Sequence, residues 1–444
     1  MNHWFAAQAK RLFFRSLRDL RCGFLEIVCP EETYSFGDRA STLRAMAVIH
    51  DPRFFARALS GADIGIGESY MDGDWSSPDL VALVRLCVRN LRLLDDRNNF
   101  FSALRAFFAG LRHRLRANTI QGSRKNIRAH YDLGNDFYEL MLDASMLYSC
   151  AQFQNAGDSL ETAQQRKLHT ICAKLRIAPG DSLLEIGSGW GAFAIHAARD
   201  CGARVTAVTI SKAQYEYAAA RIARTDVRPG HIKLLLEDYR HLPEHHGQFD
   251  KIVSIEMFEA VGFAHYDEYF SACSRLLKPD GSMLLQTITL PEQEVAAYRR
   301  RTDWIQTYIF PGSELASISE ISRSLARATN LALTHLETMG LHYAQTLAAW
   351  RERFWQHLDA VRRQGFDERF IRMWGFYLAW CEGAFRERYI NVIQLVLAKN
   401  GTPHQLFGDP AAAAQSQTSR TPEKSLALFP PPGRAEKPSP LRGS

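Results

Sequence analysis

Three glycines lie close together in the middle of the chain, between an apolar run and a stretch that is typical of a helix. Gly187, Gly189 and Gly191 follow residues 182–186 and precede the helical pattern that continues to about Arg199. A glycine turn at this place lets a ligand approach the backbone, and the following helix presents its N-terminus to that ligand. The G-x-G-x-G spacing differs from the G-x-G-x-x-G of dinucleotide-binding proteins. The sequence therefore predicts a nucleotide-type site in an α/β protein.

Glu185 lies two positions before the first glycine, and the whole arrangement resembles motif I of class I methyltransferases. The resemblance implies a Rossmann-like, doubly wound α/β sheet and S-adenosylmethionine as the cofactor. It also implies that the loop packs on the methionyl part of the cofactor, with no pyrophosphate to cradle. A structural glycine turn in another α/β protein is the alternative interpretation. The candidate cofactor residues of this motif are Glu185, Gly187, Ser188, Gly189, Trp190 and Gly191.

Short runs rich in Val, Ile and Leu alternate with helical stretches after the glycine motif, which predicts a parallel sheet. In such sheets, ligands bind beyond the carboxyl ends of the strands. We therefore expect Asp238 and the adjacent Tyr239 at the adenine, where the Asp238 carboxylate would accept a hydrogen bond from the amine. Thr209 and Gln214 would hold ribose and adenosine hydroxyls. The expected strands are residues 204–209, 232–236, 251–255 and 282–288.

Ordered segments of the chain resemble the cyclopropane-fatty-acid synthase and mycolic acid cyclopropane synthase family. Residues 67–73 also resemble the N-terminal domain of the bacterial members that act on phospholipids. This resemblance implies one-carbon transfer from S-adenosylmethionine to the double bond of an unsaturated fatty acyl chain, with a cyclopropane as the first-ranked product. It also places Tyr148 and Ser149 at the cofactor. The matching segments are residues 127–138, 147–150, 182–191, 209–214, 257–262, 308–312 and 381–386.

The implied reaction explains the residue types of the candidate catalytic site. Methyl transfer to an alkene leaves a carbocation that must lose a proton to a base. By resemblance, this base is a bound bicarbonate, held by a Cys backbone amide, a Glu, a His and a Tyr. The matching positions give these roles to Cys150, Glu259 and Tyr343. Cys381 lies in a segment that resembles a catalytic one, and its apolar neighbours equally suit a helix beneath the acyl channel.

Two departures from the family pattern leave the product open. Gln286 stands where the family has His, and the usual Glu-His pair is Glu259-Ala260 here, preceded by Glu256 where small residues are commoner. Gln can hydrogen-bond an oxyanion but cannot carry charge or shuttle a proton. Methyl-branched or methylene products therefore remain alternatives to the cyclopropane. A small-molecule amine N-methyltransferase and a non-catalytic lipid-binding protein are the rival functions.

The length of 444 residues predicts two domains with appendages. We expect a small, mostly helical and lipid-associating N-terminal domain over residues 1–125, which shows few strand signals. The catalytic domain is expected over residues 126–408. Residues 409–444 are rich in Ala, Ser and Pro and predict a disordered tail.

Two segments predict contact with a lipid bilayer. Residues 85–128 contain eleven Lys or Arg and two acids, interleaved with apolar residues, which predicts a basic amphipathic helix near residues 97–116. Residues 291–309 predict an aromatic and basic helix that caps the cofactor and walls off an acyl channel. Ordinary helix packing is the alternative for each segment.

Composition narrows the expected location of the protein and its possible metals and partners. The chain contains no run of about eighteen apolar residues that could span a bilayer, and Lys10 and Arg11 interrupt the N-terminal segment that a signal peptide would need. We therefore expect a cytoplasmic protein, peripheral at the inner face of the membrane. The eight scattered cysteines form no C-x-x-C pair, so we expect free thiols and no metal. We expect no nucleic-acid partner, and the resemblance makes a homodimer possible.

Overall fold

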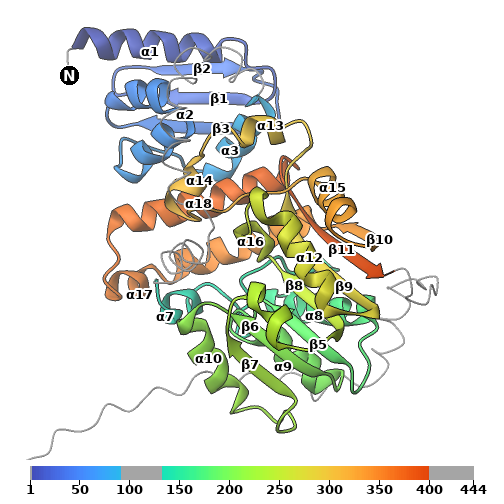
Figure 1. Ribbon diagram of the computed structural model, residues 1–444. Coiled ribbons are helices and arrows are strands. Elements are labelled where there is room, and N and C mark those ends of the chain that lie inside the picture. The colour runs from blue at the N-terminus through green and yellow to red at the C-terminus, as the bar shows by residue number, and fades with distance from the viewer. Residues whose placement is uncertain (1–2, 92–132, 400–444) are drawn as a thin grey trace, which may run out of the picture.

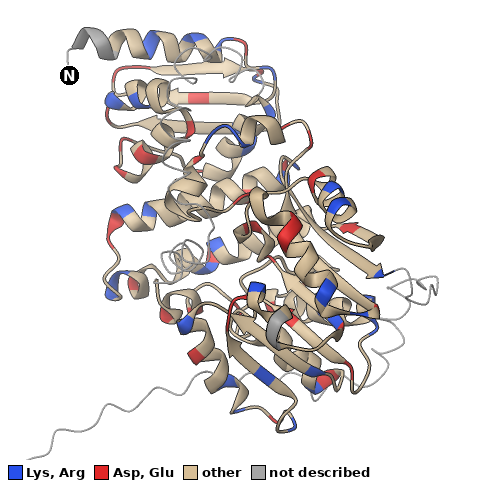
Figure 2. Ribbon diagram, in the orientation of Figure 1, with Lys and Arg blue, Asp and Glu red and all other residues tan. Residues whose placement is uncertain are grey.

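The computed structural model describes residues 3–91 and 133–399 of the chain (Figure 1). Several predictions fall outside the described residues: the basic helix near residues 97–116, the domain boundary at residue 125, the first part of the 127–138 segment, and the tail over residues 409–444. Basic and acidic residues are interspersed through the described elements (Figure 2).

The N-terminal domain is built around a mixed sheet in the order β2-β1-β3-β4, in which β1 pairs parallel with β3 and antiparallel with β2. More of its residues are helical than extended, as the sequence predicts, but the strands were not located in advance because each is short. The elements are α1 (His3–Leu17), β1 (Phe24–Val28), β2 (Thr33–Gly37), β3 (Arg44–Ile49), α2 (Arg53–Met71), β4 (Trp75–Ser76) and α3 (Leu80–Arg89).

The catalytic domain contains a sheet in the order β10-β11-β9-β8-β5-β6-β7. Its strands β5 to β9 pair in parallel, and β11 lies antiparallel between β9 and β10. This sheet is the predicted doubly wound α/β arrangement. The strands are β5 (Ser182–Ile186), β6 (Arg204–Thr209), β7 (Ile232–Leu236), β8 (Phe249–Ile255), β9 (Leu277–Thr289), β10 (Leu331–Thr338) and β11 (Asn391–Lys399).

Helices cover both faces of this sheet because alternate strand residues point to opposite sides. Leu183 packs in a core with residues of α8 and α9, whereas its neighbour Leu184 packs in a second core with residues of α11, α12 and α15. Apart from two short helices in the insertion after β9, the α-helices described after residue 133 are α7 (Asn135–Glu139), α8 (Leu160–Leu175), α9 (Ala192–Asp200), α10 (Lys212–Ile222), α11 (Leu242–His245), α12 (Tyr266–Leu276), α15 (Ile318–Ala328), α16 (Gly340–Gln356), α17 (Leu358–Arg363) and α18 (Glu368–Arg386).

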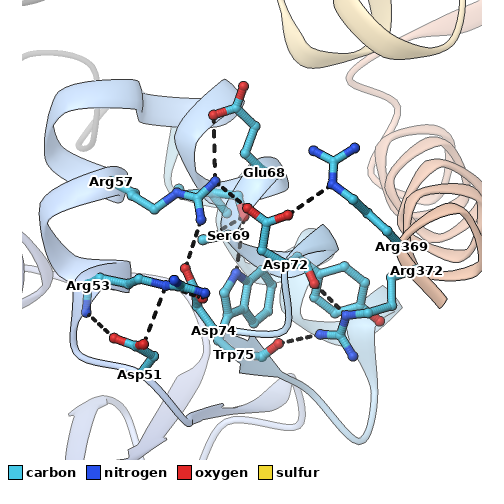
Figure 3. A network of polar contacts seen from close by, with 12 residues as sticks. Asp51, Arg53, Arg57, Glu68, Ser69, Asp72, Asp74, Trp75, Arg369 and Arg372 are labelled. Atoms are coloured by element: carbon cyan, nitrogen blue, oxygen red, sulfur yellow. Dashed lines mark hydrogen bonds and ion pairs between the residues drawn. The ribbon is translucent and has the colours of Figure 1, made fainter.

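The two domains share one hydrophobic core, which joins residues of the N-terminal sheet to residues of α16 and α18. Polar contacts border it (Figure 3). Arg369 of α18 donates to Asp72 at 2.9 Å, and Arg372 donates to the carbonyl oxygens of Tyr70 and Trp75. Because apolar and polar contacts act together, we expect the two domains to move as one body.

The insertion after β9 differs from the single helix predicted over residues 291–309. It forms two short helices, α13 (Val295–Tyr298) and α14 (Trp304–Tyr308). Asp303 separates them because its side chain caps α14 and accepts from the backbone N–H of Gln306 at 2.7 Å. The backbone N–H of Trp304 donates to Asp63 of α2 at 3.0 Å, which ties the insertion to the N-terminal domain.

Candidate active site

The glycine loop joins β5 to α9 and leaves its ligand side free of side chains. Gly187, Gly189 and Gly191 have φ values of 90°, 50° and 85°, which glycine adopts without strain. A Cβ added to Gly187 would lie 3.0 Å from Met257. Ser188 and Trp190 line the same cavity, whereas Gly191 packs against Ala218 and does not reach it.

Glu185, two residues before this loop, presents a buried oxygen to the cavity. Its Oε2 atom has no hydrogen-bond partner among the described residues, and burial raises the pKa of the carboxyl group well above its ordinary value. A buried polar atom without a partner calls for one. S-adenosylmethionine carries amine and hydroxyl donors, so the open glycine loop and Glu185 together fit this cofactor.

The ends of β6 and β7 supply the opposite side of the crevice. Thr209 donates from its hydroxyl to Gln214 Oε1 at 3.0 Å, and both side chains line the cavity. Asp238 and Tyr239 also line it, but both oxygens of Asp238 accept from Arg240, at 2.9 and 2.7 Å. Hydrogen bonding to Arg240 contributes to a pKa of Asp238 below its ordinary value, although burial opposes this effect. Its carboxylate is therefore held ionised before any ligand arrives.

Tyr148 and Ser149 lie where the N-terminal segment of the catalytic domain crosses the site. The Tyr148 hydroxyl lies 2.8 Å from that of Tyr377, and its ring stacks on Trp350. The Ser149 hydroxyl accepts from the buried ammonium group of Lys167 at 2.5 Å. Burial lowers the pKa of Lys167 to about 8, while the negative charge of Glu256 opposes that shift. Lys167 is a functional candidate that the sequence analysis missed, because it lies inside an ordinary helical pattern.

A single cavity of about 630 Å³ runs from the cofactor crevice into the N-terminal domain. Its far part is lined by apolar side chains from β1, β3, α2 and α3. The insertion and α18 supply the walls between the two parts. Residues that line this apolar part include Leu25, Ile27, Ala47, Ile49, Phe54, Trp75, Leu83, Trp304, Ile305, Phe376 and Trp380.

Glu259 lies in the wall of the cavity, just after β8. Its Oε1 atom accepts from the backbone N–H of Ile288 at 2.6 Å and from the Thr287 hydroxyl at 2.9 Å. Its buried Oε2 atom has no hydrogen-bond partner among the described residues. Burial, reinforced by the charge of Glu256, raises the pKa of Glu259 to about 7.

Cys150, Gln286 and Tyr343 converge on Glu256. The Oε1 atom of Glu256 accepts from the Cys150 backbone N–H at 2.8 Å and from Gln286 Nε2 at 2.7 Å. The Tyr343 hydroxyl also hydrogen-bonds this carboxyl group. Burial raises the pKa of Glu256, while the Cys150 amide, the Lys167 charge and the other two donors lower it.

These residues do not fit a bound bicarbonate ion. The amide expected to hold it, that of Cys150, already donates to a carboxylate of the protein. Glu256, Glu259 and Tyr343 line the cavity, whereas Cys150 and Gln286 are fully buried and do not reach its wall. An added anion would also lie beside two carboxylates.

The two candidate cysteine thiols have different surroundings. The buried Cys150 thiol donates to the carbonyl oxygen of Ala151 at 3.3 Å, and burial raises its pKa well above the ordinary value. Cys381 lines the cavity from α18, and burial raises its pKa strongly as well. Both thiols are therefore protonated at neutral pH and are poor nucleophiles.

Two further observations bear on the class of protein. Within residues 3–91 and 133–399, no group of three or more His, Cys, Asp or Glu side chains is arranged to hold a metal ion. The helices in those same ranges include none that is long and apolar enough to cross a membrane. All eight cysteines lie in the described parts of the chain and are free thiols.

Comparison with known proteins places this geometry among characterised enzymes. Residues 119–395 match the family described as mycolic acid cyclopropane synthetase. The tuberculostearic acid methyltransferase UfaA1 of Mycobacterium tuberculosis is 38% identical over 364 residues, which cover 80% of this chain and 83% of that relative. The cyclopropane-fatty-acyl-phospholipid synthase of Escherichia coli K12 is 38% identical over 79% of this chain and 87% of its own length. The structure of mycolic acid cyclopropane synthase CmaA1 complexed with SAH and CTAB superposes with a TM-score of 0.58 at 33% identity, covering 62% of this chain and 98% of that one.

Proposed function

Because the chain belongs to the mycolic acid cyclopropane synthetase family and is an S-adenosylmethionine-dependent methyltransferase, we propose that it transfers a one-carbon unit to the double bond of an unsaturated fatty acyl chain of a phospholipid. The observation that carries this proposal is the continuous cavity. It joins the glycine loop to a long apolar interior, so an acyl chain in it would pass beside the cofactor crevice.

Different residues of the chain would bind the cofactor, exclude water and stabilise the developing charge. When bound, S-adenosylmethionine supplies an electrophilic methyl group. The glycine loop, Glu185, Thr209 and Gln214 would hold it. The apolar walls would exclude water from the carbocation, which would otherwise be captured as an alcohol. The carboxylates of Glu256 and Glu259 would stabilise the positive charge that develops on the acyl chain.

The proposed substrate class determines the expected location of the protein in the cell. A phospholipid acyl chain must leave the bilayer to enter the cavity, so the protein would act as a peripheral protein at the inner face of the membrane. The N-terminal domain would accept the chain, since its strands supply part of the apolar lining of the cavity. A homodimer stays a prediction from the family resemblance.

We rank a cyclopropane product first, and a methyl-branched product is the second candidate. The tuberculostearic acid methyltransferase and the cyclopropane-fatty-acyl-phospholipid synthase are each 38% identical to the chain. The departure at Gln286 favours the second product, because a site without the family His can direct proton loss differently. A small amine substrate is disfavoured because the cavity extends through apolar residues of the N-terminal domain that such a substrate would leave empty.

Mass spectrometry of phospholipid fatty acids tests the proposal. The purified full chain would be incubated with S-adenosylmethionine and liposomes that contain a monounsaturated phospholipid. A gain of about 14 mass units, one CH2 group, is expected. Fragmentation then separates a ring from a branch. Unchanged lipid, with cofactor binding intact, would contradict acyl transfer and favour an amine substrate.

A further inference from the structure

Glu256 occupies a backbone position that disfavours its residue type. It follows β8 directly and has a φ of 48°, in the left-handed region where glycine is favoured. Its backbone N–H donates to the carbonyl oxygen of Gln286 at 2.8 Å, so the neighbouring strand holds this conformation. Residues kept in such conformations cluster at functional sites.

The side chain of Glu256 is held as an acceptor on one side and meets the cavity on the other. Its three partners, the Cys150 amide, the Gln286 amide and the Tyr343 hydroxyl, can all donate to it. The Lys167 charge lies near enough to favour the ionised form. Glu256 itself lines the cavity, so a reacting group there can reach it.

A chain of hydrogen bonds fixes the direction in which Gln286 points. Lys174 can only donate, and its ammonium group donates to Gln394 Oε1 at 2.5 Å. The Gln394 amide nitrogen therefore faces Gln286 and donates to its Oε1 atom at 2.9 Å. The Gln286 nitrogen is then directed at Glu256. A neutral, fixed donor suits a carboxylate acceptor at this place.

We infer that the Glu256 carboxylate is the base that removes the proton after methyl transfer, in place of a bound bicarbonate. This inference rests on the proposed acyl substrate. The alkene electron pair forms a bond to the methyl carbon while the carbon–sulfur bond breaks, and S-adenosylhomocysteine leaves. Glu256 then takes a proton from the new methyl group, and the released C–H electron pair closes the ring. Proton loss from a neighbouring chain carbon would give an alkene instead. The Glu256 carboxyl returns its proton to water after the product leaves.

Two variants at Glu256 distinguish the loss of the basic carboxylate from the loss of the volume of the side chain. Glu256→Gln keeps the size of the side chain but cannot accept the proton, so turnover should fall at least about 100-fold. Glu256→Gly relieves the backbone strain and frees the Cys150 N–H. Its turnover should be low without added anions and should rise at least about tenfold with bicarbonate or formate. The wild-type rate should stay the same in bicarbonate-free and bicarbonate-supplemented buffer. Calorimetric titration with S-adenosylmethionine is the control, and each variant should bind it within about threefold of wild type.

Binding of the anion is measured separately from turnover, by the line width of 13C-labelled bicarbonate in NMR. The wild type should leave the signal unchanged, and Glu256→Gly should broaden it. Wild-type turnover that depends on bicarbonate, wild-type broadening of the signal, or a Glu256→Gln variant with full turnover would overturn the inference. If no lipid product forms under any condition, the proposed acyl substrate is wrong, and the NMR comparison still decides whether Glu256 excludes the anion.

Discussion

Replacing Gly67 with alanine should disturb the contact between the N-terminal domain and the cavity wall. Gly67 lies in α2, directly against the Trp304 ring of the insertion, and an added Cβ would lie 2.3 Å from two atoms of that ring. The indole would have to shift away from α2. Trp304 is buried and lines the cavity together with Ile305, so the shift would change the wall that the acyl chain is proposed to meet.

A second glycine of the same helix provides a matched control for the size of this effect. Alanine is favoured over glycine in a helix by about 1 kcal/mol; this gain applies at Gly67, whereas Gly61 lies beside the kink of α2 at Ala62, where the backbone is not helical. An added Cβ at Gly61 would meet nothing within 4 Å. Overpacking costs about 1–3 kcal/mol. The overpacking cost at Gly67, reduced by the helix gain, should leave Gly67→Ala less stable than Gly61→Ala by up to about 2 kcal/mol.

Urea unfolding of the two variants and of the wild type measures this difference. Steady-state kinetics with monounsaturated liposomes should show a KM for lipid that is raised several-fold in Gly67→Ala and unchanged in Gly61→Ala. Equal stability and equal KM in the two variants would refute the close approach of Trp304 to α2.

Further predictions concern the cofactor loop and Glu259. Glu259→Gln should abolish turnover while the affinity for S-adenosylmethionine stays within a few fold, as calorimetry would show; a parallel loss of cofactor binding would contradict the assignment. Because the pKa of Glu259 is raised to about 7, its folded-state proton stabilises the protein at low pH, and this stability is lost as the pH rises from the ordinary value of 4.5 through 7. Urea unfolding at about pH 5 and about pH 8 should therefore show Glu259→Gln gaining stability relative to wild type at the higher pH. Gly187→Ala adds a side chain at a φ of 90° and at 3.0 Å from Met257, so its affinity for S-adenosylmethionine should fall at least about tenfold, while an unchanged affinity would contradict the loop geometry.

The parallel strands of the catalytic sheet were predictable because buried parallel strands appear as short, isolated apolar runs, whereas β10 and β11, which pair antiparallel, were not predicted. The bounds predicted for β6 and β7 match the structure, and β8 begins only two residues earlier than predicted. The prediction of a single helix in the insertion was wrong. An aromatic and basic composition indicates a helix but does not show that a new helix begins after Asp303. The N-terminal sheet was missed because β4 has two residues and the other strands are short.

For the candidate site, prediction from the sequence was limited in a different way. Sequence spacing identified the glycine loop, whose residues are local, and predicted the ends of β6 and β7. It marked Glu256 only as a departure from a family pattern. The contact that makes Glu256 part of the candidate site joins its carboxylate to the amide of Cys150, 106 positions away. Such a pairing depends on how the segment before α8 crosses the end of β8, which no local pattern reveals.

The left-handed backbone at Glu256 has an evolutionary consequence. Glycine would occupy a φ of 48° at no conformational cost, whereas glutamate is strained there, so stability alone would favour losing the carboxylate. Glutamate and glycine codons differ by a single nucleotide. A lineage could therefore exchange an internal base for a borrowed one in one mutational step, and the enzyme would stay functional wherever cellular carbon dioxide keeps bicarbonate abundant. On this view, a glutamate at this position marks selection for independence from that supply.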